Sequence, residues 1–225
     1  MKGSSRSDPT QVPRSSGGHS SGGPPSGRAP SRLPDYLTIA ECEQFLEAVD
    51  TGRHSARDVA LVFLLWGSGA RVSEVLGATL QDLRHDSEED VGILRVLGKG
   101  NRQRELMIPP RAWDALVLYL RPRGWPFNTA PEPLFLSQRN KALSRKTVWQ
   151  LFAKRAASSG IRNPRRVHPH VFRHSCATHM LLAGEDLRTV QIHLGHASVT
   201  STQIYTHLDS AHKKAAARRH PMGDR

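Results

Sequence analysis

The sequence predicts an α+β fold that is mainly α-helical and carries a small antiparallel β-sheet on one side. Between residues 38 and 219, stretches with apolar residues at helical spacing follow one another, separated by Gly, Pro or Ser signals. One region departs from this pattern, because two short apolar runs flank Gly98-Lys99-Gly100-Asn101, the composition of a tight hairpin turn. Residues 1–32 contain almost no apolar side chain, so we expect one folded domain, residues 33–221, behind a disordered tail.

The first two helices have separate starting signals. Thr38 and Glu41 form a capping box ahead of apolar residues at helical spacing, which predicts an amphipathic helix from about residue 38. Ser55 to Asp58 repeats a start signal, and the following run, Val59 to Trp66, is apolar on every side, which predicts the central buried helix. Further helices are expected at about residues 71–76, 112–120, 144–160, 170–183, 187–194, 201–208 and 211–219.

The sheet is expected from two strands, Val91 to Leu97 and Arg102 to Ile108, which the hairpin turn joins. The acidic cluster Asp86 to Asp90 is typical of a loop. The pattern is compatible with a simple β-hairpin or with a three-stranded sheet.

The composition favours a polyanionic partner. The chain has 225 residues with 32 Lys and Arg against 20 Asp and Glu, a formal net charge of +12 at pH 7. Charge alone does not choose between nucleic acid, an acidic membrane surface and simple solubility. No apolar leader is present and the strongest apolar run is too short to span a bilayer, so we expect no membrane contact and a cytoplasmic location. Cys42 and Cys176 form no CxxC pair, so neither a disulfide framework nor a cysteine zinc site is indicated.

The tail, residues 1–32, is rich in Ser, Gly, Pro and Arg. Its arginines are compatible with a loose electrostatic tether on a nucleic acid and equally with a solvated linker.

Two familiar motifs are rejected. The Gly98-Lys99-Gly100 turn has no Ser or Thr after the lysine and no helix opening behind it, so it is not a phosphate-binding P-loop. The sequence has 12 histidines, and several lie close together between residues 170 and 196. Without a His-Glu-x-x-His motif, a cysteine pair or a suitable set of carboxylates, they do not predict a metal site, and no cofactor is expected.

Three features suit phosphodiester chemistry. His170 and Arg173 lie one turn apart on one helix face, His196 follows Leu194-Gly195, and Tyr205 falls inside a predicted helix. A guanidinium matches two phosphate oxygens, a histidine moves a proton near neutral pH, and a tyrosine hydroxyl can become a covalent nucleophile. Taken singly, each residue is also compatible with a backbone contact or a core position.

Five motifs in order resemble a known family. They are Gly69-Ala-Arg71-Val-Ser-Glu74-Val-Leu, Gly98-Lys99-Gly-Asn-Arg-Gln-Arg, His168-Pro-His170-Val-Phe-Arg173-His-Ser-Cys-Ala-Thr-His, Leu194-Gly-His196 and Thr202-Gln-Ile-Tyr205-Thr-His-Leu. Together they are similar to the signature of tyrosine recombinases, especially Xer-type and phage-integrase enzymes. The likeness covers roughly residues 33–221.

The resemblance implies the catalytic-domain fold of tyrosine recombinases and a role for each matching residue. Arg71 and Arg173 would clamp the scissile phosphate, Lys99 would act as general acid and Tyr205 as nucleophile. His170 and His196 would complete the site, with Glu74 in support. The residues Arg102, Arg104, Arg162, Arg165 and Arg166 are candidate DNA contacts. The implied activity is metal-independent cleavage and rejoining of double-stranded DNA through a 3′-phosphotyrosyl intermediate.

Other functions stay open at this stage. A DNA-binding module of the same fold without recombination, a type IB topoisomerase that relaxes supercoils, and a metallohydrolase are the alternatives. Relative to the family pattern, no amino-terminal DNA-clamping domain is expected before residue 33, and His193 stands where an apolar residue is common. The basic helix 211–219 resembles the element that docks into a neighbouring protomer, which implies a tetrameric synapse formed with further copies of this chain or with a partner recombinase.

Overall fold

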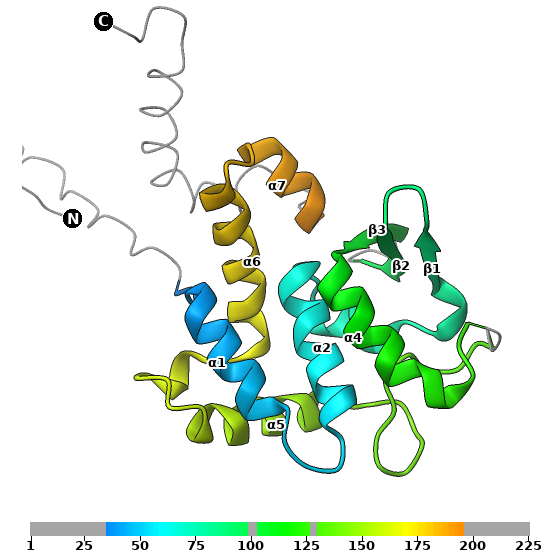
Figure 1. Cartoon of the computed structure of the whole chain (residues 1–225), viewed down its shortest axis with the longest axis horizontal. Helices are drawn as coiled ribbons and strands as arrows, with labels where there is room; N and C mark the ends of the chain where they lie inside the picture. Colours follow the sequence, from blue (N-terminus) through cyan, green and yellow to red (C-terminus); the bar gives the residue numbers. More distant parts are fainter. Residues whose placement is uncertain (1–34, 99–102, 127–129, 196–225) are drawn as a thin grey trace, which may run out of the picture. The chain divides into compact units, whose positions relative to one another are not determined.

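The computed structural model of the chain describes residues 35–98, 103–126 and 130–195. In order, its elements are α1 (Ile39–Val49), α2 (Ser55–Gly67), α3 (Val72–Gly77), the 3-10 turn η1 (Leu80–Asp82), β1 (Leu83–Asp86), β2 (Val91–Leu97), β3 (Gln103–Ile108), α4 (Pro110–Leu120), η2 (Arg121–Arg123), α5 (Arg145–Ser158), η3 (Pro164–Arg166), α6 (Pro169–Ala183) and α7 (Leu187–Leu194). Helices form most of the domain and the sheet lies to one side of them (Figure 1). The predicted fold class is confirmed.

The helical part is built around α2, which contacts α1, α4 and α6. Leu61, Leu64 and Leu65 of this helix are fully buried, so the prediction of a central helix is confirmed. The prediction that Ser55 to Asp58 forms the start signal of this helix was wrong in detail. Ser55 is already the first helical residue, and Asp58 pairs with Arg57 at 2.6 Å instead of capping the helix.

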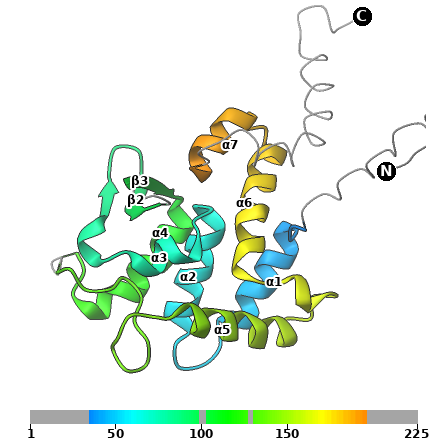
Figure 2. The ribbon, with the colours of Figure 1, turned by 180° about the vertical axis from the view of Figure 1, so that it is seen from behind.

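Two other helix starts follow the sequence. Thr38 caps α1 in the capping box with Glu41. Ser144 caps α5 by accepting a hydrogen bond from the Thr147 amide. Seen from behind, α5 lies across the N-terminal end of α6 (Figure 2).

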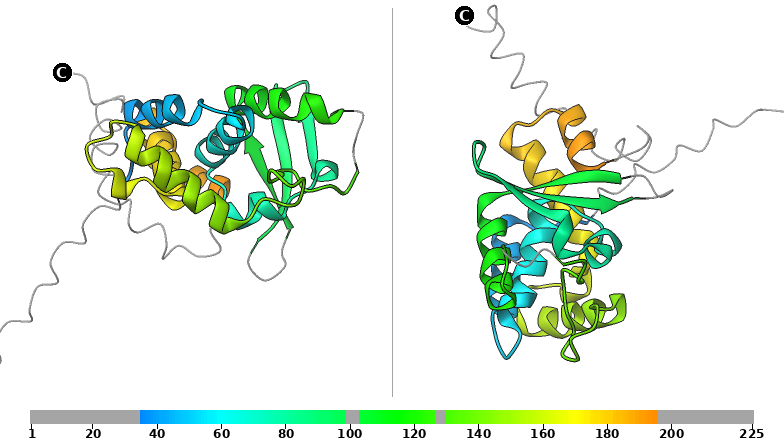
Figure 3. Two further views of the ribbon diagram at one scale, coloured as in Figure 1. Left: turned by 90° about the horizontal axis from the view of Figure 1, so that it is seen from below. Right: turned by 90° about the vertical axis from the view of Figure 1, so that its right-hand side faces the viewer.

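The sheet is antiparallel with the order β1-β2-β3. The hairpin of β2 and β3 is confirmed, with Leu94 opposite Leu106. The third strand, β1, comes from residues just ahead of the acidic cluster and pairs Leu83 with Leu94. The central strand β2 contacts both α3 and α4, and Figure 3 shows α4 running crosswise to the strands. The hairpin is therefore held against the helix that begins after Arg71.

Two apolar clusters hold these parts together. A large one runs through α1, α2, α4, α5, the start of α6 and the buried face of the sheet. A small one joins α6 to α7 through Cys176, Ala177, Leu181, Val190 and Leu194. Because α7 ends at Leu194, this second cluster fixes the residues that lead to His196.

Several sequence predictions concern residues outside the described part of the chain. They are the tail 1–32, Lys99, Arg102, His196, the helices at 201–208 and 211–219, and Tyr205. Within residues 35–98, 103–126 and 130–195, every helix is too short or too polar to span a lipid bilayer.

Candidate active site

The first part of the site is the start of α3. Arg71 occupies the position before this helix, and Glu74 reaches back to accept hydrogen bonds from the Arg71 amide at 2.8 Å and from its Nη1 at 2.9 Å. The Glu74 side chain is 2% exposed, whereas that of Arg71 is 37% exposed. Since a guanidinium has five N–H donors and Glu74 takes one of them, Arg71 is oriented by a buried anion while its outer face stays accessible.

The second part comes from the hairpin. Arg104 on β3 donates to the same carboxylate through Nε at 3.2 Å and Nη2 at 2.9 Å, a bidentate pair. Its Nη1 donates to the carbonyl of His193 at 3.3 Å. Burial by itself would raise the pKa of Glu74, but the hydrogen bonds from Arg104 and Arg71 outweigh burial and lower it. Glu74 is therefore an anion at neutral pH that ties the hairpin to α3.

The third part is Arg173 on α6, a buried guanidinium. It donates through Nη1 to the carbonyl of Gly69 and through Nη2 to the carbonyl of Leu194 at 2.7 Å. Burial, followed by repulsion from Arg71 and Arg104, lowers the pKa of Arg173 to about 10. At pH 7 it is still charged, so the structure gathers three guanidiniums around a single carboxylate. That excess of positive charge favours an anionic ligand.

His170 lies in the first turn of α6 beside these arginines. Desolvation first, and then repulsion from Arg145, Arg173 and Arg71, lowers its pKa. The imidazole is therefore mostly neutral at pH 7, the form that can accept a proton. Arg145, at the start of α5, was not singled out in the sequence. The sequence did contain a signal for this residue. The helix dipole disfavours a cation in the first turn of a helix, so an arginine at that position suggests a functional role.

The turn after α7 explains two sequence features. Gly195 has φ +65°, and a Cβ built there would lie 2.6 Å from Arg104 Nη1, so the Leu194-Gly195-His196 motif needs a glycine. Nε2 of His193 lies 3.3 Å from the carbonyl oxygen of Gly67, the last residue of α2. A histidine in place of an apolar residue therefore supplies a donor to a carbonyl at a helix end.

The predicted DNA-contact residues that the structure describes fall into two groups. Arg162 and Arg165 are exposed. Arg166 donates to the carbonyl of Tyr36 and lies 3.7 Å from Glu41, so it holds the segment that enters the domain. Arg104, with a side chain 16% exposed, is engaged by Glu74. A DNA contact for any of these stays a prediction, but the structure gives Arg104 and Arg166 intramolecular partners that the sequence did not indicate.

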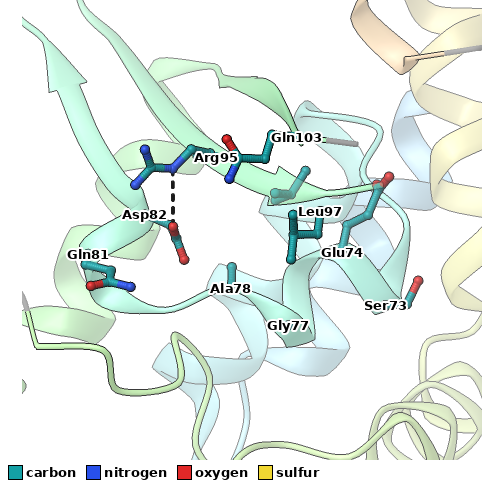
Figure 4. A pocket seen from close by; sticks show the side chains of 10 residues that line it. Ser73, Glu74, Gly77, Ala78, Gln81, Asp82, Arg95, Leu97 and Gln103 are labelled. Carbon is teal, nitrogen blue, oxygen red and sulfur yellow. Dashed lines mark hydrogen bonds and ion pairs between the residues drawn. The ribbon is translucent and has the colours of Figure 1, made fainter. Parts of the chain in front are cut away.

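A cavity of about 300 Å³ adjoins the cluster, between α3, η1 and the exposed face of the hairpin. Glu74 lines one side of it, and Arg95 faces Asp82 across the other at 3.4 Å (Figure 4). Among the described residues that line this cavity, Glu74 belongs to the arginine cluster, whereas Arg71, His170 and Arg173 do not line it. The described residues contain no group of three or more His, Cys, Asp or Glu side chains that could hold a metal ion.

The fold is that of tyrosine recombinase catalytic domains. The crystal structure of the XerA recombinase superposes with a TM-score of 0.67 at 32% identity, covering 87% of this chain and 66% of that one. The XerH site-specific recombinase bound to palindromic difH substrate, in a post-cleavage complex, gives a TM-score of 0.67 at 28% identity, covering 84% of this chain and 54% of that one.

The chain belongs to the phage integrase family, whose family model matches residues 35–212. The tyrosine recombinase XerD of Bifidobacterium longum is 41% identical over 189 residues, which are 79% of this chain and 59% of that protein. The chain thus matches somewhat less than two thirds of the length of that relative.

Proposed function

We propose that the protein is a site-specific DNA recombinase that cleaves and rejoins double-stranded DNA through a covalent 3′-phosphotyrosyl intermediate. The observation that carries this proposal is the gathering of Arg71 and Arg173, from motifs about a hundred residues apart, around Glu74 and the Gly69 carbonyl. Membership of the phage integrase family supports it.

In the proposed reaction the two guanidiniums bind the non-bridging oxygens of the scissile phosphate. The Tyr205 oxygen attacks phosphorus, the P–O5′ bond breaks, and the phosphate becomes attached to tyrosine at the 3′ side of the nick. Fixed donors of this kind stabilise the charge of the pentacoordinate transition state, each contributing on the order of 10²–10³ in rate. A 5′-hydroxyl from another strand reverses the reaction without a nucleotide cofactor, which gives strand exchange.

Two proton transfers accompany the reaction. The phenol of Tyr205 must lose a proton, and the pKa of His170 is lowered by desolvation and neighbouring arginines, so its ring is available as an acceptor at neutral pH. The leaving 5′-oxygen must gain a proton, for which we propose Lys99 in the hairpin turn. His196 would donate a hydrogen bond to a phosphate oxygen. No step requires a metal ion or other cofactor.

The proposed DNA surface includes Arg102, Arg162 and Arg165. Because such contacts are mostly to phosphates, we expect binding that weakens steeply with salt and has low sequence selectivity on its own. We also propose that the helix at 211–219 mediates a tetrameric synapse, with a second copy or a partner recombinase, and that the protein acts in the cytoplasm.

A nicked suicide duplex tests the activity. The substrate releases a short oligonucleotide on cleavage, so that religation is prevented and the protein is trapped on DNA. We expect an adduct that resists denaturant, forms fully in EDTA and is lost in Tyr205→Phe, while Tyr205→Phe still binds the duplex.

The alternative functions give other outcomes in the same experiment. DNA binding without trapping by the wild-type protein supports a DNA-binding module and contradicts the proposal. Trapping together with relaxation of supercoiled plasmids, but without strand exchange, supports a topoisomerase. Activity lost in EDTA supports a metallohydrolase.

A further inference from the structure

An exposed aromatic stack adjoins the site. Trp149 on α5 is 41% exposed, yet its ring stacks on that of His168 with centroids 5.7 Å apart and planes inclined by 19°. Its centroid lies 6.4 Å from that of His170, and the two histidine rings meet edge to face at 6.4 Å. Stacked and edge-to-face arrangements at such distances are the favourable geometries for pairs of aromatic rings, so the three rings form one packed group.

His168 is the link between this indole and α6. It is the cap of that helix, and its Nδ1 accepts the amide hydrogen of Val171 at 3.2 Å. The hydrogen bond fixes one edge of the His168 ring, and the stack with Trp149 fixes the ring face. His170 lies in the first turn of α6, where helix ends fray most easily. The stack therefore braces the turn that carries His170.

We propose that Trp149 is a positioning residue for His170, which it holds in place through the ring of His168. This inference rests on the proposed function, in which His170 exchanges a proton with the tyrosine. Arg145 lies one turn before Trp149, so one face of α5 presents a cation and an indole to the start of α6.

The same contacts set the electrostatic surroundings of His170. Arg145 faces it from α5, Arg173 from α6 and Arg71 from the start of α3, and each disfavours its charged form. His168 is also kept neutral, first by desolvation and then by repulsion from His170, against a small opposing effect of Asp35. Removing the indole hydrates both rings, so the pKa of His170 should rise toward its ordinary value.

The first experiment measures trapping on the nicked duplex and DNA affinity in the full chain. Trp149→Ala is expected to slow adduct formation on the order of tenfold with unchanged affinity, because a displaced proton-transfer group loses its near-attack geometry. Trp149→Phe keeps a flat ring and should restore most of the rate. Gln150→Ala, exposed on the same helix, is the matched control and should behave as wild type.

Two further variants separate capping from stacking. His168→Asn retains a side-chain acceptor for the α6 cap but loses the ring, so it should be as slow as Trp149→Ala. In a His170→Ala background, Trp149→Ala should cause no additional loss of rate. If it slows that background as well, or weakens DNA binding, Trp149 contacts DNA directly and the proposal is overturned.

The second experiment does not depend on cleavage. The histidine ring resonances are titrated by NMR, with His170 assigned from the signal absent in His170→Gln. We expect a higher pKa for His170 in Trp149→Ala than in wild type, and the wild-type value in Trp149→Phe and Gln150→Ala. An unchanged pKa overturns the positioning role. Absence of any adduct with the wild-type protein would instead refute the proposed function, and the titration would still decide the role of Trp149.

Discussion

Replacing Glu74 with glutamine should destabilise the domain by about 3 kcal/mol, because the change removes the anion at the centre of an arginine cluster. The substitution preserves size and leaves one oxygen as an acceptor. Its amide nitrogen, however, would face N–H groups of Arg71 or Arg104, which cannot accept a hydrogen bond.

The magnitude follows from the burial of the pair. Glu74 and Arg104 have side chains 2% and 16% exposed, and breaking such a pair by removing one partner costs about 3–5 kcal/mol. The contact with Arg71 adds less than about 1 kcal/mol, since that side chain is 37% exposed and solvent screens it. Glutamine retains one oxygen that can still accept a hydrogen bond, and this offsets part of the combined destabilisation. The expected net loss is about 3 kcal/mol in the free energy of unfolding.

Urea unfolding followed by circular dichroism measures this difference in the free energy of unfolding. The matched control is Glu105→Gln on β3, the strand that carries Arg104, and it breaks the pair of Glu105 with Arg84. Both of those side chains are well exposed, so we expect a loss below about 0.5 kcal/mol. The midpoint should fall for Glu74→Gln with an unchanged denaturant slope.

The reasoning would be refuted if the two variants unfolded at the same urea concentration. The reasoning would also fail if adding Arg104→Met to Glu74→Gln recovered none of the lost stability. The second change removes the guanidinium that has been left without its anion, so part of the stability should return.

The other predictions concern the same cluster. The pKa of Glu74 is lowered by its hydrogen bonds from Arg104 and Arg71, although burial opposes them, so its contribution is complete above the ordinary value of about 4.3 and is lost as pH falls through the lowered pKa. The stability gap between wild type and Glu74→Gln should therefore narrow in acid, and a gap independent of pH would contradict this. Gly69→Ala should cost about 2–4 kcal/mol in thermal unfolding, because φ is +59° and the added Cβ would lie 2.4 Å from Leu194, whereas a wild-type melting temperature would disprove it. Arg173→Lys should keep most DNA affinity but slow trapping on the order of 10²–10³, since lysine cannot replace the fork, and a wild-type trapping rate would exclude the clamp.

Local sequence signals predicted most of the elements. The Thr38–Glu41 capping box, the apolar run in α2 and the hairpin around Gly98 each depend on residues a few positions apart, and the structure has helices and strands where they indicated. The strand β1 was left open because a four-residue strand takes its stability from pairing with β2, which local spacing does not report.

The sequence by itself determined the fold class and, through ordered motifs, the family and the candidate residues Arg71, Glu74, His170 and Arg173. Only the tertiary structure decided the partners of these side chains. From the sequence, Arg104 is predicted as a DNA contact, but the register of the hairpin and the turn after α7 place it between Glu74 and His193. These contacts join residues tens of positions apart, and the burial that makes their charges costly to separate exists only after the chain has folded.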